Sequence, residues 1–159
     1  MINKEQFVQY RTVAIMNNLY ELKHFAKGDR IHVQAQQIWL ILVSHIESSK
    51  LSNPRPRWVQ PITYSEVASR MKREEPNAGL FLSRQLGILG NLCLENGLPP
   101  INCIVVNKST RVPGSEVVLT GDDSLDDDQK AVFSYDWFSV RVPTTGMLRS
   151  VWEDRASWK

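Results

Sequence analysis

Apolar residues recur at intervals of three and four through the first part of the chain, a spacing that predicts helices. The first helix is expected over residues 4–26, with Gly28 just beyond it as a glycine stop. A second helix is predicted from His32 to about Ser49, and its apolar centre at residues 38–43 assigns it to the core. Two prolines in residues 51–57 end this pattern and predict an exposed basic loop.

Shorter elements follow this loop. A brief extended run begins at Ile62, and residues 65–72 are typical of a short helix. Thr63 and Glu66 have the spacing of a capping box, in which each side chain bonds to the backbone of the other residue. The next helix is predicted at residues 80–94. Two short helices separated by a turn are therefore expected here.

A β-hairpin is predicted after the helix end at Asn96-Gly97. Residues 101–106 are apolar and rich in β-branched side chains, which favours a strand. Residues 108–114 carry turn chemistry, and residues 116–120 supply the return strand. This hairpin takes the position of the wing in a winged helix-turn-helix.

The end of the chain is acidic and then aromatic. Residues 122–128 form an acidic run that leads into residues 131–138, which we expect to be helical because acidic residues favour a helix N-terminus. Residues 146–158 place apolar side chains at roughly helical spacing. This region predicts two further helices.

These elements predict a mainly helical α+β fold, as a single domain over residues 1–159. Its core is a winged helix-turn-helix at residues 33–120, packed against an N-terminal helix. Residues 121–159 form an acidic, Trp-containing helical extension.

Charge is segregated along the chain, although the net charge of +2 is weakly basic for a DNA-binding protein. Residues 54–111 hold eight basic and four acidic side chains, whereas residues 112–159 hold nine acidic and five basic ones. Such a distribution steers a polyanion toward one face and away from another.

Composition points to a globular protein, with 42% hydrophobic and 23% charged residues. The longest apolar run is too short to span a bilayer, and residues 1–11 lack the pattern of a leader peptide. Cys93 and Cys103 lie in apolar runs without a CxxC pair, which favours reduced thiols. We therefore expect a cytoplasmic protein with no membrane association.

Catalytic and cofactor-binding motifs are missing from the sequence. It contains no phosphate-binding loop, dinucleotide-binding glycine motif, zinc-protease motif, nucleophile elbow or zinc knuckle. His24, His32 and His45 are too few to indicate a metal site, and the acidic run at residues 122–128 lacks the spacing of an EF-hand loop. We predict no enzymatic activity, no cofactor and no metal, and we interpret the acidic run as a solvated helix start.

Two short stretches, Thr63-Tyr64-Ser65-Glu66-Val67-Ala68 and Ser83-Arg84-Gln85-Leu86-Gly87, are followed in order by Cys103 and Gly114. This order resembles the DNA-binding domain of the alkyltransferase-like proteins, over about a third of the chain. In that family a Thr-Tyr-Gly-Glu-Leu-Ala stretch opens the first helix of the motif, and Arg-Ala-Val-Gly opens the recognition helix. The resemblance implies that Arg84 takes the place of a flipped nucleotide and that Tyr64 lies near the DNA backbone.

The sequence departs from that family at its reactive cysteine. The family's Pro-Cys-His-Arg is replaced by Asn102-Cys103-Ile104-Val105, so the histidine that would activate the thiol is missing. A cysteine without a basic neighbour stays mostly protonated at neutral pH, and we do not expect alkyl transfer by Cys103. The run from Leu98 to Lys108 with its closing Pro-Gly also resembles small uncharacterised proteins of phages and bacterial mobile elements, which assigns no activity.

Double-stranded DNA is the ligand that this pattern favours. Arg84 and Asn91 are seven positions apart and should share one helix face, where arginine and asparagine can form bidentate pairs with bases. Basic residues of the first helix and the wing would contact phosphates. The predicted nucleic-acid-binding residues are Tyr64, Arg70, Lys72, Arg73, Ser83, Arg84, Asn91, Lys108 and Arg111.

Two other interpretations stay open. The bases at residues 70–73 could pair with Glu74 and Glu75 as an ordinary solvated face, and Trp58 could cover the core or stack on a base. Alternatively, the protein acts as an inhibitor or immunity-type protein through a partner bound at its acidic, tryptophan-rich end. The anchors of that second surface would be residues 122–128 with Trp137, Trp152 and Trp158.

Overall fold

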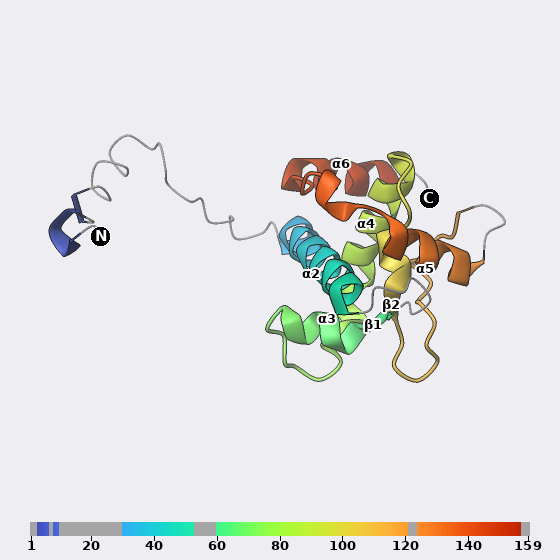
Figure 1. Cartoon of the computed structure of the whole chain (residues 1–159). Coiled ribbons are helices and arrows are strands. Elements are labelled where there is room, and N and C mark those ends of the chain that lie inside the picture. The colour runs from blue at the N-terminus through green and yellow to red at the C-terminus, as the bar shows by residue number, and fades with distance from the viewer. Residues whose placement is uncertain (1–2, 7, 10–29, 53–59, 121–123, 157–159) are drawn as a thin grey trace.

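The computed structural model describes residues 3–6, 8–9, 30–52, 60–120 and 124–156 (Figure 1). Residues 4–6 and 8–9 are helical, and most of the predicted N-terminal helix lies outside the described residues. The same is true of Trp58 with most of the basic loop, of Asp122 and Asp123, and of Trp158.

The fold is mainly helical with one small sheet, so the predicted α+β class is confirmed at this level. Several predicted elements appear close to their expected bounds. In chain order the elements are α2 (Arg30–Ser52), β1 (Ile62–Thr63), α3 (Tyr64–Arg70), the 3-10 helix η1 (Ala78–Leu82), α4 (Ser83–Glu95), the 3-10 helix η2 (Ile101–Ile104), β2 (Val105–Val106), α5 (Leu125–Ser134), the 3-10 helix η3 (Trp137–Ser139) and α6 (Thr145–Ala156).

The core is built around α2 and α4, which pack against each other and against α6 (Figure 1). Ile38, Leu42 and Ile46 on α2 are completely buried, as its apolar centre predicts. In α4, every residue from Gln85 to Cys93 except Asn91 is buried. The helix expected to read DNA is therefore also a central scaffold helix.

Local sequence signals at the helix ends are confirmed. Thr63 caps α3 by accepting a hydrogen bond from the Glu66 amide at 3.2 Å, and the Glu66 carboxylate accepts one from the Thr63 amide at 2.8 Å. Gly97 adopts a φ of 65° after α4, and the Leu98 amide donates to the Cys93 carbonyl at 2.8 Å. This is the Schellman ending expected of Asn-Gly.

The predicted hairpin is wrong. Residues 101–104 form a 3-10 helix, and β2 pairs in parallel with β1, so that Ile62 lies opposite Val105. The turn forms, because the Asn107 amide donates to the Val112 carbonyl at 2.9 Å, but residues 116–120 are not a strand. A second turn follows at residues 114–117, where the Val117 amide donates to the Gly114 carbonyl at 3.3 Å.

The first of the two C-terminal helices is shifted from its predicted position at residues 131–138. Ser124 caps α5, which begins at Leu125 within the acidic run and ends at Ser134, so residues 135–138 do not belong to it. The physical reason is that Asp126, Asp127 and Asp128 occupy the first turn of α5 instead of preceding it. The last predicted helix is present as α6.

Within the described ranges, no helix has both the length and the apolar character needed to cross a membrane.

Candidate nucleic-acid interface

A groove of about 530 Å³ separates α3 and η1 from the loop at residues 107–116, which we call the 107–116 loop. In Figure 1, α3 and this loop project from the same side of the helical body. Tyr64, Arg73, Ser83 and Lys108 of the predicted site line the groove together. Their neighbours there include Ser65, Asn77, Asn107 and Ser115, which are short polar side chains from each wall.

Tyr64 holds the loop in place. Its hydroxyl donates to the Glu116 carboxylate and accepts a hydrogen bond from the Gly114 amide at 2.8 Å. A side chain on Gly114 would collide with both partners, since an added Cβ would lie 2.9 Å from the Tyr64 hydroxyl and 2.4 Å from Glu116. Burial and the bond to Glu116 raise the pKa of Tyr64 above its ordinary value. Both hydrogen bonds of the Tyr64 hydroxyl are therefore made within the protein. The family resemblance instead implies that this residue lies near the DNA backbone.

The other wall of the groove, η1, is fixed by close backbone packing. A Cβ on Gly79 would lie 2.9 Å from the Tyr64 Cβ and 3.0 Å from its carbonyl carbon. Leu82 and Ala78 are buried at the two ends of η1, whereas Leu80 and Phe81 between them are 71% and 63% exposed. Nothing in the local sequence indicates that Leu80 and Phe81 lie on the surface, because an apolar pair at the start of a helix is usually part of the core.

The groove is lined by two basic residues, Arg73 and Lys108, and by three acidic ones, Glu74, Glu75 and Glu116, while further basic side chains lie on the surface of the same elements. Arg70, Lys72, Arg84, Lys108 and Arg111 are exposed, and none forms an ion pair with another residue of the described chain. Only one pair of the solvated-face interpretation is present among the described residues, namely Arg73 with Glu75 at 2.9 Å. The exposed cations of this region are therefore free of ion pairs with described residues, whereas the groove itself also carries acidic side chains.

Lys72 and Arg111 are held in left-handed backbone conformations, with φ values of 61° and 60°. Lys72 follows the C-cap residue Met71 of α3, and the Arg73 amide beyond it donates to the Ala68 carbonyl at 3.0 Å. Glycine usually occupies such a position, because a Cβ makes it unfavourable. Lys72 and Arg111 thus occupy two positions whose backbone conformation would favour the uncharged residue glycine.

Asn91 does not join this surface, which corrects the prediction. Its amide nitrogen donates to the Gly87 carbonyl one turn earlier at 2.7 Å, and the side chain is half-buried. Ile88 lies between Arg84 and Asn91 on the same face of α4 and is completely buried. The exposed residues of α4 are Ser83 and Arg84 at its start and Glu95 at its end.

The two thiols are unsuited to nucleophilic chemistry. Cys93 and Cys103 are completely buried, and burial raises the pKa of Cys93 to about 12. Burial also raises the pKa of Cys103, with the nearby Asp128 carboxylate adding to the effect. Both thiols therefore stay protonated at neutral pH, even more firmly than a free cysteine.

The acidic run serves local structure where it is described. Asp127 bonds to the capping Ser124, Asp126 pairs with Lys130, and Asp128 accepts from the Thr120 amide at 2.9 Å. The described residues contain no group of three or more His, Cys, Asp or Glu side chains placed to hold a metal ion.

Trp137 is not an exposed anchor, which corrects the expectation for the C-terminal surface. It is 1% exposed and packs edge-to-face on Trp39 with ring centroids 5.5 Å apart. Trp152 is partly buried against the same core. Among the described residues of this region, the exposed aromatic side chain is that of Phe138, at 75%.

No family model matches the chain, and no curated protein or solved structure is significantly similar to it.

Proposed function

We propose that this protein is a non-catalytic binder of double-stranded DNA, acting through α3, η1, the first turn of α4 and the 107–116 loop. In this proposal α3 and α4 serve as a helix-turn-helix, and the 107–116 loop takes the place of the wing. The resemblance to the DNA-binding domain of the alkyltransferase-like proteins, carried by residues 63–68 and 83–87, is in keeping with it.

The observation that carries the proposal is the set of exposed cations on and after α3, at the start of α4 and on the 107–116 loop that form no ion pair with described residues. Neutralising phosphates releases counterions from DNA, and this supplies much of the affinity of DNA-binding proteins. A cation already paired with a carboxylate would have to break that pair first. Arg70, Lys72, Arg84, Lys108 and Arg111 need no such exchange with described residues.

Each part of the surface has a distinct task. Ser83 and Arg84 stand at the accessible end of α4, from which a recognition helix contacts base edges. The five unpaired cations contact phosphates and set the position of the protein on the duplex. Tyr64 acts indirectly, since it fixes the loop that carries Lys108.

We expect Arg84→Ala to weaken binding to a labelled duplex about tenfold, and Lys108→Ala to weaken it by a smaller factor that is the same for all sequences. Fluorescence anisotropy at about 50 and 200 mM salt measures both, and the wild-type affinity should fall steeply between these concentrations. Lys130→Ala is the matched control, because Lys130 is an exposed cation on α5 whose partner is Asp126. Absence of binding at the lower salt concentration, or equal losses for Lys130→Ala and Arg84→Ala, would contradict the proposal.

The variant Lys72→Gly removes a positive charge at a position where glycine is compatible with the fold, so its effects on DNA binding and on stability can be measured separately. The left-handed backbone at this position favours glycine, so stability should stay the same or rise by about 0.5 kcal/mol. Loss of one phosphate contact should lower the salt dependence of DNA binding by about 0.9 in the log-log slope. Urea unfolding and the salt titration test the two parts, and an unchanged slope would remove Lys72 from the interface.

A further inference from the structure

Two large apolar side chains, Leu80 and Phe81, point into water on η1, and we call them the η1 apolar pair. They directly precede Ser83 and Arg84, the exposed residues at the start of α4. Single apolar side chains on a surface are ordinary, whereas an apolar patch rimmed by polar residues marks an interaction site. The η1 apolar pair lies within the surface proposed to bind DNA, so its contribution to that contact can be derived.

The backbone of η1 is fixed from both ends. The Leu80 amide donates to the Asn77 carbonyl at 2.9 Å, and Leu82 is completely buried. Gly79 packs so closely on α3 that an added Cβ would lie 2.9 Å from the Tyr64 Cβ. The η1 apolar pair is therefore presented on a rigid support, and little conformational entropy is lost when a ligand covers it.

The neighbours of the pair indicate which ligand covers it. The backbone stays right-handed helical through Leu82 and Ser83, so residues three positions apart lie side by side across the junction of η1 and α4. Leu80 thus lies beside Ser83, and Phe81 lies beside Arg84. Arg84 is exposed and forms no ion pair with the described residues. A matching ligand combines negative charge with apolar surface within one helical turn.

The acidic side chains of the groove do not prevent such a contact. Glu75 is paired with Arg73 at 2.9 Å, and Glu116 accepts a hydrogen bond from the Tyr64 hydroxyl. Phe81 and Arg84 are not among the residues that line the groove. A duplex can therefore contact both of them without entering the groove.

We propose that Phe81, supported by Leu80, inserts between two adjacent base pairs of the bound duplex and kinks it. This proposal rests on the DNA-binding function proposed above. Double-stranded DNA exposes the apolar faces of its bases only where two base pairs separate, and its phosphates carry the negative charge that Arg84 attracts. Proteins that insert phenylalanine or leucine in this way unstack one base step and bend the duplex.

Bending of a short duplex tests the insertion. A duplex of about 20 base pairs with a fluorescent donor and acceptor at its two ends should show increased energy transfer when the wild-type protein binds. Phe81→Ala should remove most of this increase and weaken binding about tenfold, because one contact between an aromatic ring and a base is lost. Leu80→Ala should weaken binding by a smaller factor. Neither variant changes a charge, so the salt dependence of binding should equal that of the wild type.

The base step at the centre of the duplex provides a second test. Pyrimidine–purine steps such as TA are easily unstacked, whereas A-tracts are stiff. The wild type should therefore bind a duplex with a central TA step several-fold more tightly than one with a central A-tract. Phe81→Ala should bind the two duplexes with equal affinity.

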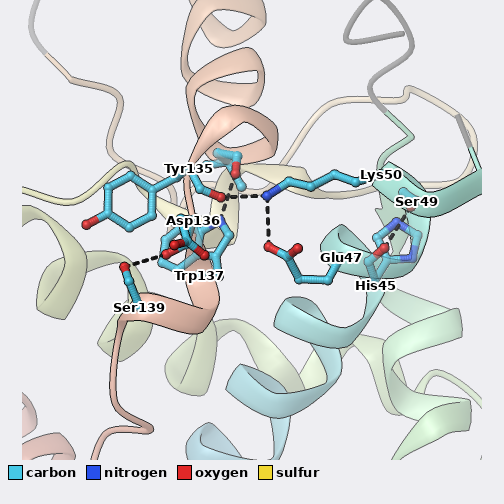
Figure 2. Close-up of polar contacts among 9 residues, drawn as sticks. His45, Glu47, Ser49, Lys50, Tyr135, Asp136, Trp137 and Ser139 are labelled. Atoms are coloured by element: carbon cyan, nitrogen blue, oxygen red, sulfur yellow. Dashed lines mark hydrogen bonds and ion pairs between the residues drawn. The ribbon is translucent and has the colours of Figure 1, made fainter. Parts of the chain in front are cut away.

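Phe138→Ala is the matched control, since Phe138 is also an exposed phenylalanine on a 3-10 helix. It lies outside the groove beside α3, on a segment attached to α2. Figure 2 shows this attachment, in which the Lys50 ammonium group donates to the Tyr135 carbonyl at 2.6 Å. Phe138→Ala should bind and bend the duplex as the wild type does. Circular dichroism of each variant checks that the fold is kept.

The outcomes separate this proposal from the proposed function. Salt-dependent binding without bending, or equal bending by the wild type and Phe81→Ala, would overturn the insertion and leave DNA binding in place. Loss of bending in Phe138→Ala as large as in Phe81→Ala would also overturn it. Absence of duplex binding would overturn both proposals. Binding of the wild type but not of Phe81→Ala to phosphatidylglycerol vesicles, without duplex binding, would assign the η1 apolar pair to a membrane surface instead.

Discussion

Gly90→Ala is expected to lower the free energy of unfolding by about 3 kcal/mol. An added Cβ would lie 2.3 Å from the side-chain nitrogen and 2.6 Å from the side-chain oxygen of Asn102. Asn102 is only 1% exposed and lies in η2, which packs on α4, so its amide has little free space into which to move. Urea unfolding of the wild type and the variant measures the loss.

The physical cause can be isolated with Asn102→Ala. The Asn102 amide has no hydrogen-bond partner in the described structure, and a buried amide in this state already costs stability. Removing it should cost little by itself, and Gly90→Ala should then cost about 1 kcal/mol or less in the Asn102→Ala background. Gly146→Ala is the control, since Gly146 lies on α6 with no close neighbour, and alanine there should be neutral or stabilising. Equal losses for Gly90→Ala in both backgrounds would show that the contact with Asn102 is not the cause.

Tyr64→Phe is expected to destabilise the fold by about 2 kcal/mol at neutral pH and to weaken DNA binding as a consequence. Loss of the hydroxyl removes the donor from the Glu116 carboxylate, which is 9% exposed, and the acceptor from the Gly114 amide. The 107–116 loop would then lose its attachment to α3, and Lys108 would lose its fixed position. Urea unfolding and duplex anisotropy on the same samples measure both effects.

The same contact predicts a dependence on alkaline pH. The pKa of Tyr64 is raised in the folded protein, because burial and the bond to Glu116 favour the neutral phenol. The unfolded chain therefore releases this proton first, near pH 10 for an unperturbed tyrosine. The stabilisation is complete below that pH and declines as pH rises from there toward the folded pKa. The difference in stability between the wild type and Tyr64→Phe should shrink correspondingly.

Tyr135→Phe provides the matched control for Tyr64→Phe. Tyr135 is also half-buried, but its hydroxyl forms no hydrogen bond within the described part of the chain. Its removal should leave stability and loop attachment nearly unchanged. A Tyr64→Phe variant that is as stable as Tyr135→Phe at neutral pH would show that the contact between Tyr64 and Glu116 contributes nothing.

Several features of this protein were determined by the sequence alone, because they depend on neighbouring residues. The capping box at Thr63 and Glu66 needs only a separation of three positions, and the Schellman ending at Gly97 needs only a residue that tolerates a positive φ. The burial of the centre of α2 follows from its apolar residues on every side. Helix positions and the mainly helical class were predictable for these reasons.

Other features were decided by contacts between residues far apart in the chain. The sequence of residues 101–120 is typical of a hairpin, but Val105 pairs with Ile62 and Glu116 bonds to Tyr64, so no return strand forms. A bond over 52 sequence positions leaves no trace in the local pattern. Strand propensity depends strongly on such tertiary context.

The orientation of side chains on each helix was likewise set by packing. Arg84 and Asn91 are correctly spaced to share a face of α4, but that face is covered beyond the first turn, and Ile88 between them is buried. Tryptophan is a residue type that often anchors interfaces, but Trp137 fills the core beside Trp39. Its neighbour Phe138 is the residue that lies on the surface. The sequence determined which residues could form helices and which carried charge. Only the tertiary structure decided which of their faces meet water, because burial depends on what the rest of the chain places against each helix.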